Sequence, residues 1–259
     1  MEFPRKELLK DCKNKQEVEV ILKMGERALK TWQDQWSEFL SVPIREEAIK
    51  VLTPLNELNY FSFGGFDGAE RQRLCISRNE QFNQESIPIN GIVVTGNFFF
   101  DRAEVLDFRQ SIELLGVKSG DIGDIWLNGE RGAQIICSKN ASEYLHNKEG
   151  MVRDVKIYCE AVETNELKPP LKRIPKRIKT VEASTRLDAI ASAGFGISRA
   201  RASSHIQEGR IRLNWKQTKQ STRSIEIGDK IHLDQKGSLE ILHLEKTKRE
   251  RWRVELLRQ

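Results

Sequence analysis

The sequence predicts an α+β protein with a helical N-terminal part, a middle domain of mixed strands and helices, and a basic C-terminal domain. Three observations lead to this prediction. The 259 residues exceed the usual length of one domain. Apolar residues follow a helical period at first and mixed periods afterwards. Basic residues concentrate in the last third of the chain. The expected parts are residues 1–58, 59–167, a linker at 168–180, and 181–259.

Residues 1–58 are expected to be helical. Their apolar residues approximate a 3.6-residue stripe, with Glu and Lys between them. Four further apolar residues continue this face and are expected in a core rather than in a cofactor site: Trp32, Trp36, Phe39 and Leu40. Pro43 suits the first turn of a second helix, and Pro54 marks its end or a kink.

Residues 59–167 carry patterns of both strands and helices. Helices are expected at Arg102–Leu115 and Ser142–Asn147. Gly64, Gly65 and Gly68 mark a turn, and Asn128-Gly129 marks a hairpin. This alternation predicts a compact α+β domain with a ferredoxin-like or RNA-recognition-like sheet. The expected strands are Tyr60–Phe63, Arg73–Ile76, Gly91–Val94, Ile122–Leu127, Ala133–Cys137 and Val152–Val162.

Composition argues against several classes of protein. The chain has no run of about 18 apolar residues, so no membrane span is expected. The N-terminus has neither the apolar stretch of a signal peptide nor the acid-poor composition of a transit peptide, so we expect a cytoplasmic protein. The cysteines lack CxxC spacing, which favours core side chains over zinc ligands or disulfides: Cys12, Cys75, Cys137 and Cys159. We expect no metal and no cofactor.

The charge of the chain is unevenly distributed. Residues 168–259 contain 22 Lys and Arg against 10 Asp and Glu, a formal charge of +12, whereas residues 1–167 carry −7. A strongly basic domain suits a polyanion, because each phosphate that it neutralises releases a condensed counterion. A basic solvated surface without a partner is the alternative.

Residues 168–180 form the expected linker. The segment contains Pro169, Pro170 and Pro175, which favour extended backbone, together with several Lys and Arg residues. It could lie along RNA or serve only as a spacer. Beyond residue 181, strands are also expected at Lys230–Leu233, at Leu239–Leu242 and in the basic tail Lys246–Arg253.

Ser184–Asn214 predicts two short helices and a strand. The first helix begins after Ser184 or Thr185 and ends near Gly194, and the second begins after Ser198 and ends at Gly209. Several basic side chains are expected to share one surface that binds the backbone of structured RNA, with weak sequence preference. The predicted RNA-binding residues are Arg186, Ser198, Arg199, Arg201, His205, Arg210, Arg212 and Lys216.

This segment resembles the S4 domain, the small αL RNA-binding module of ribosome-associated proteins. The residues that carry the resemblance are Arg186-Leu187-Asp188, Ser198-Arg199, Ile206 with Gly209 and Asn214, and Gly228-Asp229. The family usually has Asn-Gly where this chain has Asn214-Trp215. Trp does not readily adopt positive φ, so a different turn is expected here. Trp215 could stack on an exposed base or pack, and Arg186 with Asp188 could be a structural ion pair or an RNA contact.

The whole chain resembles the YlmH family, including its cyanobacterial and plastid branch, the photosystem II S4 domain proteins. Two further segments carry this resemblance: Gly64–Arg71 and Leu115–Ile125. It implies a monomeric, non-catalytic factor that binds ribosomal RNA or tRNA, on the large ribosomal subunit in relatives linked to ribosome quality control. The branch name implies a link to photosystem II. Asp121 and Asp124 are expected to form turns rather than to catalyse.

Two other functional classes remain open. The chain lacks the sequence signatures of the synthetases, pseudouridine synthases and methyltransferases that carry an S4 module, and its four histidines are dispersed. An RNA-modifying enzyme that uses the middle domain is nevertheless an alternative. A protein-interaction or assembly factor, whose basic domain binds an acidic protein or a membrane surface, is the other.

Overall fold

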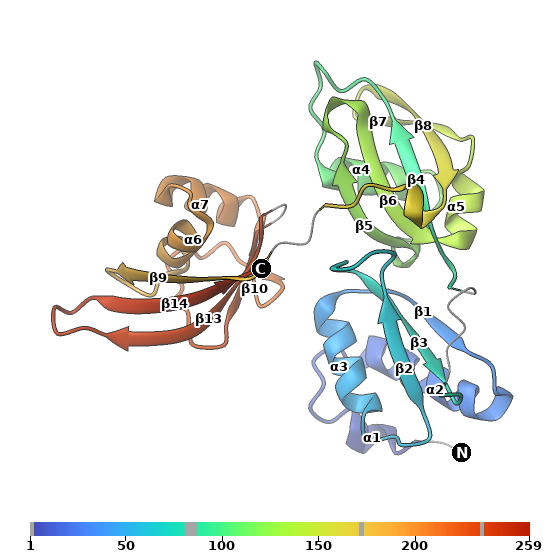
Figure 1. The fold of residues 1–259 in the computed structure, drawn as a ribbon, viewed down its shortest axis with the longest axis horizontal. Coiled ribbons are helices and arrows are strands. Elements are labelled where there is room, and N and C mark those ends of the chain that lie inside the picture. The colour runs from blue at the N-terminus through green and yellow to red at the C-terminus, as the bar shows by residue number, and fades with distance from the viewer. Residues whose placement is uncertain (1–2, 81–86, 171–173, 234–235) are drawn as a thin grey trace. The chain divides into compact units, whose positions relative to one another are not determined.

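Helices and strands alternate along the whole chain, and the predicted α+β class is confirmed (Figure 1). The computed structural model describes residues 3–80, 87–170, 174–233 and 236–259. The chain forms two units, Met1–Lys172 and Arg173–Gln259, each with its own core.

The first part of the Met1–Lys172 unit combines helices with a small sheet. Its helices are α1 (Arg5–Leu8), α2 (Lys15–Thr31) and α3 (Val42–Leu52), and the last has Pro in its first turn as predicted. The strands β1 (Gln35–Leu40), β2 (Asn59–Phe63) and β3 (Gln72–Ser77) form an antiparallel sheet in the order β1-β3-β2. The helices pack on this sheet through one apolar cluster.

Two expectations for this region were wrong. Residues 35–40 were expected to continue a helical face, but α2 ends where Trp32 adopts a φ of 58°, and β1 then pairs with β3. Strands β2 and β3 were expected in the middle domain, but they pair with β1 instead. A boundary after residue 58 would therefore divide one sheet.

The middle part has the strand order that a ferredoxin-like fold requires. Its elements are β4 (Ile89–Thr95), α4 (Val105–Leu114), β5 (Ile122–Leu127), β6 (Gly132–Ser138), α5 (Lys139–Leu145), β7 (Glu149–Val152) and β8 (Val155–Val162). The antiparallel sheet has the order β5-β6-β4-β8-β7, so the first and third strands of the fold are central. The single long strand expected at Val152–Val162 is a hairpin, because Arg153, with a φ of 53°, turns the chain between β7 and β8.

One face of the middle sheet is covered along its length, and the other is covered in part, because Lys156, Tyr158 and Glu160 of β8 are exposed on it. One face packs against α4 and α5 through the largest apolar cluster, which includes Phe108 and Ile135. On the other face, Ile136 of β6 packs with Phe39 of β1 and with Leu167, which follows the last strand. Phe66 joins this second cluster and contacts the Trp126 ring, with the ring centroids 5.5 Å apart. The first and middle parts thus share a core.

A buried carboxylate also joins these two parts. Asp124 of β5 accepts hydrogen bonds from the backbone N–H groups of Glu70 (2.6 Å) and Arg71 (3.0 Å). The Arg71 guanidinium donates to the carbonyl oxygens of Ile122 and Phe39. Asp124 was expected to form a turn, but it lies within β5, and only Asp121 lies in a turn, at Ser119–Asp121. Burial raises the pKa of Asp124 above the ordinary value.

The Arg173–Gln259 unit is a helix pair on a six-stranded sheet. Helices α6 (Leu187–Phe195) and α7 (Arg199–Gln207) lie on one side of the sheet (Figure 1). The strands of this sheet are β9 (Lys176–Glu182), β10 (Ile211–Leu213), β11 (Lys216–Gln217), β12 (Lys230–Leu233), β13 (Gly237–Lys246) and β14 (Trp252–Arg258). The sheet order is β11-β10-β12-β13-β14-β9.

Two expected boundaries in this unit were wrong. Lys176–Thr180 were assigned to the linker, but they belong to β9, which pairs with β14 over its whole length. Residues 171–173 of the expected linker lie outside the described residues. The last strand was expected at Lys246–Arg253. Instead β13 ends at Lys246 and β14 begins at Trp252, because the segment between them forms the turn of a hairpin.

None of the helices in the described ranges combines the length and hydropathy that crossing a membrane requires. The three cysteines at positions 75, 137 and 159 are buried among apolar side chains, and Cys12 is partly exposed. Burial raises the pKa of Cys75 to about 12 and that of Cys159 to about 11. The prediction that the cysteines fill cores therefore holds for these three.

We predict that a thiol reagent at pH 8 modifies Cys12 and spares the three buried cysteines in the folded protein. Thiolates are the reactive species. Partial burial also raises the pKa of the Cys12 thiol but leaves it accessible, whereas burial shields the other three thiols and raises their pKa. The measurement is mass spectrometry of the alkylated protein, with a urea-unfolded sample as the control in which all four react. Rapid modification of Cys75 before unfolding would contradict the packing described above.

We also predict that Gly65→Ala destabilises the protein more than Gly129→Ala does. Both glycines have positive φ, 91° and 59°, so each substitution introduces backbone strain of about 1–2 kcal/mol. A Cβ at position 65 would also lie 2.6 Å from the buried Ile136 side chain, whereas nothing lies within 4 Å at position 129. Overpacking adds roughly 1–3 kcal/mol at position 65. Urea unfolding measures the difference, and equal losses would contradict the close approach of this turn to β6.

Candidate nucleic-acid interface

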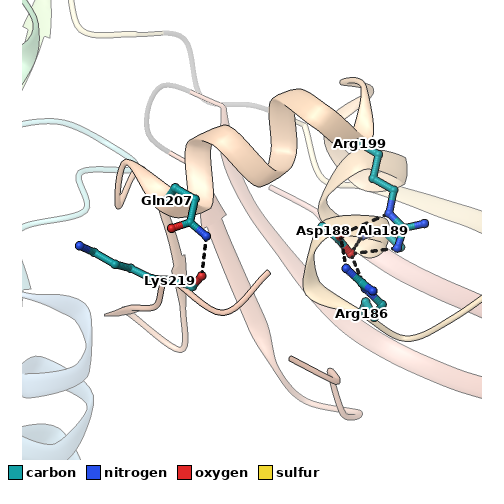
Figure 2. Close-up of polar contacts among 6 residues, drawn as sticks. All are labelled: Arg186, Asp188, Ala189, Arg199, Gln207 and Lys219. Carbon is teal, nitrogen blue, oxygen red and sulfur yellow. Dashed lines mark hydrogen bonds and ion pairs between the residues drawn. The ribbon is translucent and has the colours of Figure 1, made fainter. Parts of the chain in front are cut away.

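Asp188 connects the two helices of the C-terminal unit. Its carboxylate, only 3% exposed, receives two hydrogen bonds from Arg186, at 3.1 and 2.8 Å (Figure 2). The Arg199 guanidinium, at the start of α7, approaches the same carboxylate at 3.3 Å. The backbone N–H of Ala189 donates to it as well. Arg186 and Asp188 thus form a structural ion pair that also includes Arg199.

The two arginines nevertheless present nitrogen atoms to solvent. The side chain of Arg186 is 38% exposed and that of Arg199 is 51% exposed. Each guanidinium has five N–H donors, and the contacts with Asp188 use only some of them. Burial alone would raise the pKa of Asp188, but the hydrogen bonds from Arg186 and Arg199 outweigh it and hold the pKa below its ordinary value. The carboxylate is therefore ionised at neutral pH and orients both cations.

Helix α7 carries the next predicted residues. The Ser198 hydroxyl accepts a hydrogen bond from the Arg201 N–H at 3.2 Å, so Ser198 caps the helix as predicted. Arg201 is exposed and forms no ion pair with the described residues. His205 was expected to share its exposed face, but the His205 side chain is only 14% exposed. The ring lies next to Ile206, which belongs to the core, so a spacing of four residues was not enough to expose it.

The remaining predicted residues lie on and beside β10. The Arg210 Nε lies 3.1 Å from Glu208, just before the strand begins. Arg212 was expected to share one outward face with Arg210. The alternation is as predicted: Ile211 and Leu213 are buried beneath the helices, and Arg212 lies on the opposite face of the sheet, away from α7. Lys216 is exposed on the edge strand β11.

The turn between β10 and β11 differs from expectation. Trp215 was expected to change the turn, yet both Asn214 and Trp215 have positive φ, at 48° and 65°. The Asn214 side chain fixes this geometry: its amide donates to Asp229 at 2.6 Å, and its oxygen accepts from the Lys230 N–H at 2.9 Å. Trp215 therefore takes the conformation that Gly usually adopts in such a turn.

Sequence reasoning missed the segment that follows this turn. The Lys219 carbonyl accepts a hydrogen bond from the Gln207 side chain at the C-terminal end of α7 (Figure 2). The carbonyls of Ser221 and Arg223 accept from the first N–H groups of α6. The exposed Lys219 and Arg223 side chains are thereby held beside the helix pair. Their basic character was visible in the sequence, but their docking depends on backbone contacts that no motif specifies.

Five basic residues on and beside the helix pair are together called the helix-pair surface, and among them Arg201 lies on the side of α7 that points away from the core: Arg186, Arg199, Arg201, Lys219 and Arg223. Figure 2 shows Arg186 and Arg199 at one end of α7 and Lys219 at the other. A nine-residue helix extends about 13 Å, so the cations are spread along its length. Such an arrangement matches several phosphates of a folded polyanion rather than a single small anion.

The central strands of the middle sheet are packed on their second face, while Tyr158 of β8 is exposed. RNA-recognition domains stack bases on exposed aromatic residues of their sheet. Here the second face of the central strands β4 and β6 packs with Phe39, Phe66 and Leu167. Within the described ranges, no group of three His, Cys, Asp or Glu side chains converges as a metal site would require.

We predict that Asp188→Asn costs roughly 1–2 kcal/mol of stability at pH 7, because it weakens charge-assisted hydrogen bonds to partly exposed arginines. The folded-state pKa of Asp188 is depressed, so its contribution is present above the unfolded pKa, near 3.8, and is lost as pH falls through the folded pKa. Urea unfolding should therefore separate the variant from wild type at pH 7 and bring them together at low pH. A constant difference across this range would contradict the role of the charge.

Comparisons with known proteins point to one family. Residues 13–81 match the family model described as YlmH, N-terminal. The chain is 25% identical over 228 residues to the ribosome-associated protein quality control protein P2 of Bacillus subtilis (strain 168), with 86% of each chain covered. A solved structure, the cell division protein ylmH from Streptococcus pneumoniae, aligns with a TM-score of 0.47 and 14% identity over 59% of this chain and 93% of its own. The family match and the Bacillus similarity relate this chain to the YlmH family.

Proposed function

We propose that this chain is a non-catalytic, ribosome-associated protein that binds structured ribosomal RNA or tRNA through an S4-type C-terminal unit. The observation that carries the proposal is the helix-pair surface, in which a buried Asp188 holds Arg186 and Arg199 at the solvent boundary. Guanidinium groups fixed in this way can contact phosphate oxygens without first losing much conformational freedom.

Two further findings support this proposal. The formal charge of +12 over residues 168–259 favours a polyanionic partner. The similar Bacillus subtilis protein is named as a ribosome-associated quality control protein, and its similarity extends over 86% of this chain. On this basis we propose association with the large ribosomal subunit in the cytoplasm, as a monomer. Membership in the photosystem II S4 branch stays a prediction from the sequence.

The packing on the second face of β4 and β6 bears on where RNA binds. If RNA were held on the middle sheet, bases would need access to β4 and β6, whose second face is packed within the unit. The C-terminal unit carries its cations outside its core and needs no rearrangement to bind. We therefore assign the contact with RNA to the C-terminal unit and a structural role to the shared core of residues 3–167.

We predict that Arg199→Ala/Arg201→Ala weakens binding to ribosomal RNA and tRNA at least about tenfold at physiological salt. It should also reduce the slope of log affinity against log salt by roughly 2, one for each phosphate that the variant no longer neutralises. Fluorescence anisotropy across a salt series measures both quantities. The matched control is Arg177→Ala/Lys179→Ala, which removes the same charge from exposed positions of β9 on the opposite edge of the sheet.

A single variant and two possible results distinguish specific RNA contacts from an effect of overall charge or of structure. Arg201→Ala alone should lower the affinity in part without affecting the Asp188 contacts, which guards against a purely structural effect of Arg199. If the control pair lowers affinity as much as the Arg199/Arg201 pair does, the effect is one of overall charge. If wild type does not bind RNA at all, the proposal is wrong and an acidic protein partner becomes the better hypothesis.

A further inference from the structure

The β10–β11 turn holds a residue that its backbone conformation disfavours. Leu213 and Lys216 pair across the turn, and only Asn214 and Trp215 lie between them. Both have positive φ, as the type I′ hairpin turn requires, and the second position of that turn strongly favours Gly. A bulky aromatic residue at positive φ is strained, and such residues persist where the surrounding structure or a function maintains them.

The geometry of the turn does not itself need an indole. Asn214 accounts for the turn, because its side chain bonds to Asp229 and to the Lys230 N–H, and Asn tolerates positive φ. Gly at position 215 would adopt the same conformation without strain. The reason for Trp must therefore lie in what its ring contacts.

The ring is held in a defined orientation at the end of the hairpin. Its centroid lies 5.0 Å from that of His232, with an interplanar angle of 34°. The Arg212 guanidinium lies 5.9 Å from the ring. Arg212 and His232 pair with each other across β10 and β12, on the sheet face opposite the helices. Trp215 remains partly exposed.

We propose that Trp215 is a stacking platform for an unpaired nucleobase of the RNA. This inference rests on the proposed RNA binding and adds to it a second contact of different chemistry. The Trp215 ring is already held by His232 and by the Arg212 guanidinium. It therefore loses little conformational freedom when a base stacks on its exposed part. Stacking on aromatic rings tolerates any base.

The substrate class follows from this chemistry. A base inside a regular A-form duplex has both faces stacked and cannot reach a protein ring. Stacking on Trp215 therefore requires a bulged, looped or terminal nucleotide next to the duplex. The chain would thus combine backbone contacts from the helix-pair surface with selection for RNA that has an unpaired base.

The test compares Trp215→Gly and Trp215→Phe with wild type, all in the full chain. Gly relieves the backbone strain and removes the ring, whereas Phe keeps a ring on a strained backbone. Binding is measured by anisotropy with three RNA hairpins that share one stem: a bulge-free stem, the stem with a one-nucleotide bulge, and the same bulge with an abasic nucleotide. Urea unfolding of each variant measures stability in parallel.

We expect Trp215→Gly to bind the bulged RNA at least about tenfold more weakly, within the range for one stacked base, and to bind the bulge-free stem as wild type does. The abasic bulge should weaken wild type similarly and should leave Trp215→Gly unchanged. Trp215→Phe should retain most of the affinity. Stability of Trp215→Gly should stay close to that of wild type, because relief of backbone strain offsets the absence of packing against His232.

The opposite pattern would show that Trp215 only packs. In that case Trp215→Gly would destabilise the unit, and wild type would bind the bulged and abasic RNAs equally. This result would overturn the stacking inference and leave the proposed function intact, provided that wild type still binds the stem in a salt-dependent manner. Failure of wild type to bind any of the three RNAs would overturn both.

Discussion

The C-terminal unit depends on one buried carboxylate, Asp188. A carboxylate with 3% exposure is tolerated only when it is paired and hydrogen-bonded, and removing its partners would cost roughly 3–5 kcal/mol. Arg186 and Arg199 supply that pairing from the starts of two different helices, so the ion pairs also set how α6 and α7 lie against each other. The same contacts hold two cations at the surface. The same ion pairs therefore stabilise the packing of the two helices and hold the two guanidinium groups at the surface.

The Met1–Lys172 unit uses buried charge differently. Asp124 bonds to backbone N–H groups of a glycine-rich turn, and Arg71 bonds to backbone carbonyls of two strands. Burial lowers the pKa of Arg71, as expected for a cation surrounded by protein rather than by water. These groups connect the small sheet to the middle sheet. Together with the apolar cluster on the second face of β4 and β6, they make the two sheets share one core.

Local patterns predicted most elements, and long-range pairing caused most of the errors. Helix α7 and its Ser198 cap follow from adjacent residues, as do β5 and β6 around their turn. Strand β1 was missed because Trp36 and Phe39 fit a helical stripe as well as a strand, and only pairing with β3, far along the chain, decides between them. His205 was placed on an exposed face for a related reason, whereas Arg212 lies opposite Ile211 and Leu213 as predicted, on the sheet face away from the helices. Periodicity indicates which residues share a face, but the core determines which face is covered.

The residues that identify the S4-like segment are mainly those that build it. Asp188 positions the arginines, Ser198 caps α7, Ile206 fills the core, and Asn214 binds Asp229 across the turn. A motif of this kind predicts a scaffold and leaves its partner open. Under the proposed function, any preference among RNAs would come from side chains that the motif does not specify, such as the exposed Arg201 and Lys219 and the partly exposed Trp215. Trp215 is informative because it departs from the family pattern at the position where that departure strains the backbone. The ring packs on His232, and the proposed contact with an unpaired base would give a second reason to keep Trp in a conformation that suits Gly.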